Sequence, residues 1–85
     1  MLIENDQVQE YRRDNTRLID VGNGESRQVR MTPQLWEELE FVQIMEYVST
    51  AELAVYAREE MQLQGISFDQ AFRAVVAYLS NRWTP

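Results

Sequence analysis

The sequence predicts a small, mainly α-helical fold in which one short β-strand is followed by three helices. Polar and apolar residues alternate from Gln28 to Met31, which is typical of a half-buried strand. From Thr32 onward the apolar residues recur every three or four positions, which is typical of amphipathic helices. Because a lone strand leaves its backbone N–H and C=O groups without partners, we expect a second copy of the chain to supply them, giving an intertwined homodimer.

The predicted strand, residues 26–31, has one polar and one apolar face. Alternation turns its polar side chains outward: Ser26, Gln28 and Arg30. Its apolar side chains point inward: Val29 and Met31. Arg27 falls on the apolar side, where its stem can pack against the core while its charge stays in water.

The chain divides into an N-terminal arm, residues 1–23, and a domain, residues 24–85. The arm is expected to be either partly disordered or to carry a short extra strand. Residues 16–21 (TRLIDV) are the candidate for that strand, and the glycines at 22 and 24 indicate a turn after it. Whether this segment pairs with residues 26–31 as a hairpin or lies elsewhere stays open.

Three helices are predicted from their caps. Thr32 is a suitable N-cap with Pro33 at the first helical position, and the helix runs for about fourteen residues. A capping box, Ser49 with Glu52, starts a second helix that ends near Gln64 with Gly65 behind it. A similar pair, Ser67 with Gln70, starts the third.

Apolar side chains at helical spacing are expected to pack inward. The first helix presents Leu35, Trp36, Leu39, Val42 and Met45, and the second presents Leu53, Tyr56, Ala57 and Met61. The third presents Phe68, Ala71, Phe72, Val75 and Leu79, and Tyr78 is also expected in helix packing. Together with the strand, they predict a dimer core that contains Val29, Met31, Leu35, Trp36, Leu39, Val42 and Leu53.

Composition excludes several classes of protein. The 85 residues contain no Cys and no His, so there is no disulfide framework or thiolate zinc site, and the commonest general base is absent. We therefore expect no enzyme activity, no metal and no cofactor. Adjacent carboxylates such as Glu37 and Glu38 point in different directions on a helix and are interpreted as solvated. No apolar run is long enough to cross a bilayer, so no membrane contact is expected and the predicted location is cytoplasmic.

The formal charge of −6 is unevenly distributed. All eight basic residues are arginines, and five of them precede Met31, against six carboxylates. From Thr32 onward three arginines face eight carboxylates. The acidity thus belongs mainly to the helices, and the N-terminal part is the more basic one.

The residues from Gly24 to Trp83 resemble the ribbon-helix-helix DNA-binding proteins, in particular the subfamily with a third C-terminal helix. The residues that carry the resemblance around the strand and first helix are Gly24, Val29, Arg30, Met31, Pro33, Leu35, Trp36 and Leu39. Two later segments also match: VSTAEL (48–53) is similar to the start of the second helix of that subfamily, and ISFDQAFRAVVAYL (66–79) is similar to its third-helix segment. This chain has Tyr47 where many members have a small residue.

The resemblance implies a homodimer that places an antiparallel β-ribbon in the major groove of double-stranded DNA and regulates transcription as a repressor. It implies base contacts by Ser26, Gln28 and Arg30. It implies phosphate contacts by Arg27 and, at the start of the second helix, by Ser49 and Thr50.

An alternative stays open for function. The acidic helices, or the N-terminal arm, could bind a protein partner, and the chain would then be an interaction module or antitoxin-like adaptor that keeps the dimer fold without reading DNA.

Overall fold

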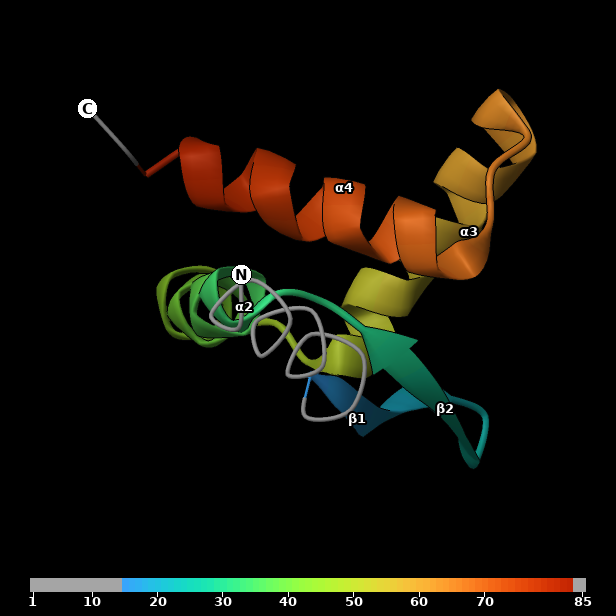
Figure 1. The fold of residues 1–85 in the computed structure, drawn as a ribbon, viewed down its shortest axis with the longest axis horizontal. Coiled ribbons are helices and arrows are strands. Elements are labelled where there is room, and N and C mark those ends of the chain that lie inside the picture. Colours follow the sequence, from blue (N-terminus) through green and yellow to red (C-terminus); the bar gives the residue numbers. More distant parts are fainter. Residues whose placement is uncertain (1–14, 84–85) are drawn as a thin grey trace, which may run out of the picture.

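The computed structural model describes residues 15–83. Residues 1–14 of the predicted arm, and with them the expectation of partial disorder there, lie outside the described residues. A two-stranded sheet is followed by three helices (Figure 1): β1 (Thr16–Gly22), β2 (Glu25–Arg30), α2 (Pro33–Glu46), α3 (Thr50–Gln64) and α4 (Phe68–Asn81). The hairpin lies on one side of the domain and α4 crosses the other, packing against both α2 and α3. No helix within residues 15–83 combines the length and the apolar character that a bilayer crossing requires.

β1 and β2 form an antiparallel hairpin within one chain, in which Arg17 lies opposite Val29 and Ile19 opposite Arg27. The turn that joins them has positive φ angles at Gly22, Asn23 and Gly24, and glycine and asparagine tolerate this conformation best. Asp20 Oδ1 also accepts a hydrogen bond from the Gly22 N–H at 2.8 Å. The open question about residues 16–21 is therefore settled as a hairpin.

The prediction of a single strand is wrong, whereas the alternative of a short extra strand at residues 16–21 is confirmed. β1 supplies within one chain the ladder that was expected from a second copy. With β1 in place, the backbone of β2 does not need another chain to satisfy its inner groups.

A single core joins the inner face of the hairpin to all three helices. Six of the seven residues predicted for a dimer core are buried within this one chain: Val29, Met31, Trp36, Leu39, Val42 and Leu53. Leu35 is partly buried against them. α4 contributes most of the remaining core, including Phe68, Ala71, Phe72, Val75, Val76 and Leu79. The burial of these side chains therefore does not depend on a partner.

The predicted helix starts are confirmed. The Thr32 side chain accepts a hydrogen bond from the Leu35 N–H at the start of α2. Capping boxes begin the other two helices, between Ser49 and Glu52 and between Ser67 and Gln70. Each box satisfies backbone groups that the first helical turn leaves unpaired.

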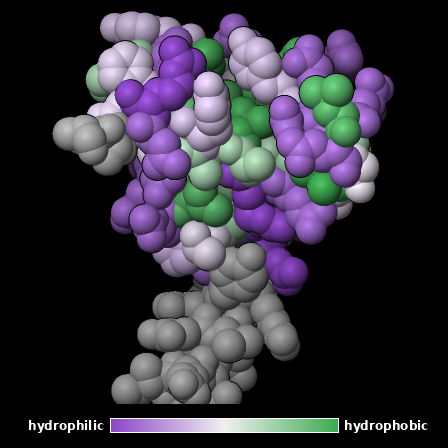
Figure 2. All heavy atoms as spheres, turned by 90° about the horizontal axis from the view of Figure 1, so that it is seen from above, coloured by the Kyte–Doolittle hydropathy of each residue, from purple (hydrophilic) through white to green (hydrophobic). Residues whose placement is uncertain are grey.

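Three side chains that were predicted to pack inward lie at the surface instead. Tyr56 and Tyr78 are 50% and 68% exposed, and Met45 is 38% exposed. Helical spacing fixes the direction of each side chain, but burial also requires that another element pack there. In the view of Figure 2, hydrophobic residues show between hydrophilic ones.

Candidate nucleic-acid interface

The solvent side of the hairpin, here called the hairpin face, is built from three cross-strand pairs. Thr16 lies opposite Arg30, Leu18 opposite Gln28, and Asp20 opposite Ser26. All six side chains are exposed except Thr16, which is half-buried. The face therefore presents polar groups around a central leucine, Leu18, that is 65% exposed.

The predicted polarity of the strand is confirmed, since Ser26, Gln28 and Arg30 are exposed while Val29 and Met31 are fully buried. Three members of the hairpin face were not predicted as site residues: Thr16, Leu18 and Asp20. The signal was available in the sequence. The Gly-Asn-Gly turn between residues 16–21 and 25–30 favours a hairpin, and a hairpin places these three beside the predicted residues.

The end of β2 is held by the first turns of α4. The Met31 N–H donates to the oxygen of Asn15, toward β1, so the backbone groups of the preceding residue point to the opposite edge. There, Asp69 Oδ2 accepts from the Arg30 N–H at 3.2 Å, and Arg73 donates to the Arg30 oxygen at 2.7 Å. These bonds fix the backbone that carries the Arg30 side chain.

Two other arginines of the hairpin stack on core aromatic rings. The guanidinium of Arg17 lies 4.7 Å from the ring centroid of Trp36, and that of Arg27 lies 4.7 Å from the ring centroid of Phe68. Both arginines remain exposed. Arg27 lies on the core side of the strand, as predicted, and stays exposed, but it is the guanidinium itself that contacts the core. The cation–π contact orients each charged group.

A second arginine lies near Arg27 at the turn end of the hairpin. Arg58, from α3, donates to the oxygen of Val21 at 2.8 Å. An open pocket of about 330 Å³ lies between them, and its lining includes Glu25, Ser26 and Phe68. Two guanidinium groups suit the oxygens of a phosphate, whereas Glu25 opposes a negative charge there.

Charge is segregated in the described residues. Five of the six arginines within residues 15–83 belong to the hairpin or donate to its backbone: Arg17, Arg27, Arg30, Arg58 and Arg73. Three carboxylates lie on the same part of the molecule: Asp20, Glu25 and Asp69. The other seven carboxylates of this range are on α2 and α3. Within residues 15–83, no three acidic side chains come close enough together to hold a metal ion.

The start of α3, where phosphate contacts were predicted, is occupied by internal hydrogen bonds. The Glu52 carboxylate accepts from the Ser49 N–H at 2.8 Å, and Ser49 Oγ accepts from the Glu52 N–H at 3.1 Å. Thr50 Oγ1 donates to the Asp20 oxygen at 2.6 Å. A phosphate contact at Ser49 and Thr50 stays a prediction, and the phosphate would have to compete with the carboxylate of Glu52.

Comparison with protein-family models, with curated proteins and with solved structures finds no match for this chain, so its function is inferred from the arrangement of its own residues.

Proposed function

We propose that this protein is a sequence-specific DNA-binding protein that inserts its hairpin face into the major groove, and that it acts as a homodimeric transcriptional regulator of the repressor type. The observation that supports the proposal best is the exposed polar side of a two-stranded antiparallel ribbon. The major groove of B-DNA admits such a ribbon, and every base pair presents a distinct pattern of donors and acceptors there.

The residues of the hairpin face match the chemistry of base edges. Arg30 can donate two hydrogen bonds to O6 and N7 of guanine, and Gln28 can pair with N6 and N7 of adenine. Leu18, opposite Gln28, suits the methyl group of thymine. Ser26 and Thr16 can donate or accept, whereas Asp20 can accept from the amino group of cytosine. In this proposal one chain supplies a complete reading surface.

Phosphate contacts are assigned to two arginines on the core side of the hairpin, whose side chains still reach solvent. Arg17 and Arg27 are exposed, and their stacking on Trp36 and Phe68 limits the entropy that a phosphate contact would cost. The gathering of arginines around the hairpin offsets the net charge of the whole chain locally. Binding should therefore weaken steeply as salt rises.

The homodimer has a different role here from the one expected from sequence. Each chain already carries a paired hairpin, so a second copy would add a second reading surface rather than complete the first. Two such surfaces related by a two-fold axis would recognise a roughly palindromic site.

The test is selection of bound sequences from a random pool of duplex DNA, followed by fluorescence anisotropy on the selected site. Arg30→Ala should weaken specific binding by about 1–3 kcal/mol. Arg82→Ala is the matched control, because Arg82 is also exposed and lies at the far end of α4. Both variants should give the circular dichroism spectrum of the parent. Equal affinity of the two variants would remove Arg30 from base recognition.

The alternative, an interaction module that does not read DNA, is favoured by one feature of the helices. Large apolar side chains are exposed on their surfaces, among them Ile44, Tyr47, Leu63 and Tyr78. Exposed apolar groups that gather into a patch mark interaction sites. If the selection enriches no sequence and anisotropy shows no binding even at low salt, this alternative is preferred.

A further inference from the structure

A groove lies between α3 and α4, and the end of α2 and the segment after it also line it. It has a volume of about 490 Å³. Val75 and Leu79 form its floor from α4, and Val48 lines it from the segment between α2 and α3. These three side chains belong to the core or pack against it, so the floor is fixed by the fold. The groove does not include any residue of the hairpin face.

Two tyrosines stand on opposite walls of the groove, Tyr56 on α3 and Tyr78 on α4. Both are at least half exposed, although helical spacing assigned them to packing. Aromatic side chains are enriched at the centres of protein interfaces, where their burial contributes most of the binding energy. An apolar segment laid between these rings would cover both of them.

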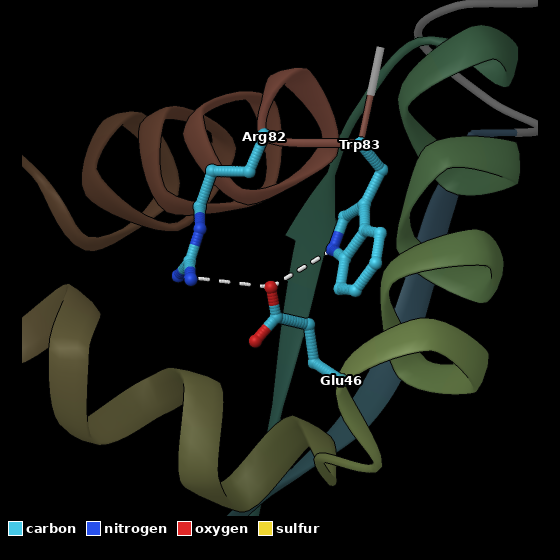
Figure 3. A network of polar contacts seen from close by, with 3 residues as sticks. All are labelled: Glu46, Arg82 and Trp83. Atoms are coloured by element: carbon cyan, nitrogen blue, oxygen red, sulfur yellow. Dashed lines mark hydrogen bonds and ion pairs between the residues drawn. The ribbon is translucent and has the colours of Figure 1, made fainter.

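The rim of the groove is acidic. Glu59 and Glu60 line it from α3, and Glu46 lines it from the end of α2. The one arginine of the lining, Arg82, is 3.7 Å from the Glu46 carboxylate, and the indole N–H of Trp83 donates to the same carboxylate at 2.9 Å (Figure 3). Glu46 is thus paired with a positive charge within the chain. Glu60 accepts from the uncharged Gln64 side chain at 2.7 Å, so it keeps its negative charge, as does Glu59, for a partner.

We propose that this groove binds a basic amphipathic helix of a partner protein. Rows of side chains on two neighbouring helices form a channel into which the ridge of a third helix packs. The apolar face of the bound helix would lie on Val75 and Leu79 between the two tyrosines. Lysine or arginine side chains at its edge would reach Glu59 and Glu60. The charge of the rim selects this partner over an acidic or a neutral helix.

The probe is a fluorescent peptide of about 18 residues, five helical turns, made of leucine and lysine with leucines at helical spacing. A second peptide has the same composition but scrambled leucines, and a third has glutamate in place of lysine. The full chain should bind the first peptide in anisotropy measurements and bind the other two more weakly. Its affinity should fall as salt rises, because the rim charges are screened.

Substitutions locate the site. Tyr78→Ala and Glu59→Gln should each raise the Kd of the first peptide by about fivefold or more. The matched controls are Leu63→Ala, exposed on α3 outside the groove, and Glu40→Gln, exposed on α2. Neither control should change the Kd. Arg30→Ala should also leave it unchanged, which separates this site from DNA binding.

Two kinds of result would overturn the proposal. One is tight binding of the scrambled basic peptide, or equal effects of the groove and control substitutions, since either outcome would mean non-specific attraction. The other is a change in sedimentation with Tyr78→Ala while peptide affinity stays constant, which would assign the groove to a second copy of this chain.

Discussion

The guanidinium of Arg73 donates a hydrogen bond of 2.7 Å to the main-chain oxygen of Arg30, joining α4 to the edge of the hairpin. Asp69 accepts from the N–H of the same strand residue at 3.2 Å. Together they occupy both backbone groups that Arg30 presents away from β1. A further strand could pair at this position only after these bonds break, so they protect the end of an edge strand.

The first prediction concerns Asp69, whose carboxylate also lies in the first turn of α4. Asp69→Ala should increase the hydrogen-exchange rate of the Arg30 amide by about fivefold, the effect of losing a bond of about 1 kcal/mol. The Met31 amide, bonded to the Asn15 oxygen, is the internal control and should keep its rate. Exchange can be followed residue by residue by NMR. Equal acceleration of both amides would indicate general loss of stability.

The second prediction concerns Tyr47, which ends α2 with a φ of +56° and a side chain that is 91% exposed. A residue other than glycine in this left-handed conformation is strained by about 1 kcal/mol. Tyr47→Gly should therefore raise the free energy of unfolding by up to about 1 kcal/mol, or the Tm by about 4–8 °C. Thermal unfolding measures the change.

Tyr47→Ala is the control for this substitution, because it removes the same exposed ring and keeps the strained φ. It should leave the Tm close to that of the parent. If alanine stabilises the protein as much as glycine does, the gain comes from the lost ring and the strain interpretation is wrong.

The third prediction concerns Trp36, whose indole N–H donates to the buried Asn15 oxygen at 2.7 Å and whose ring carries the Arg17 guanidinium. Trp36→Phe removes the bond, and we expect a loss of about 1–3 kcal/mol in urea unfolding. A double-mutant cycle of Trp36→Leu with Arg17→Ala isolates the cation–π term, because leucine, unlike phenylalanine, has no π face; the term is expected at about 0.5–1 kcal/mol. Additive losses would show that the stacking contributes nothing.

The fourth prediction concerns the proposed dimer. The core of this chain is complete without a partner, so a chain diluted until sedimentation reports a monomer should keep its far-UV circular dichroism spectrum. The physical reason is that β1 pairs with β2 and that Val29 and Met31 are already buried. Loss of the spectrum in step with dissociation would instead mean that the chains fold only together.

Local chemistry in the sequence was sufficient for the helices. The caps at Thr32, Ser49 and Ser67 satisfy backbone groups of their own first turns, so neighbours along the chain decide where these helices begin. Neighbours along the chain also decide the polarity of β2, because its alternating residues turn Gln28 and Arg30 outward. Helical spacing predicted the burial of Tyr56 and Tyr78 wrongly, because it gives the direction of a side chain but not whether another element packs against it.

The sequence by itself determined the helices, the polarity of β2 and the asymmetry of charge, since each depends on residues a few positions apart. Only the tertiary structure decided that β2 pairs within its own chain and that α4 holds its edge through Asp69 and Arg73. A strand presents the same backbone donors and acceptors to any partner. Which segment fills them therefore depends on the whole core, whose packing places α3 against β1 and α4 against α2 and α3.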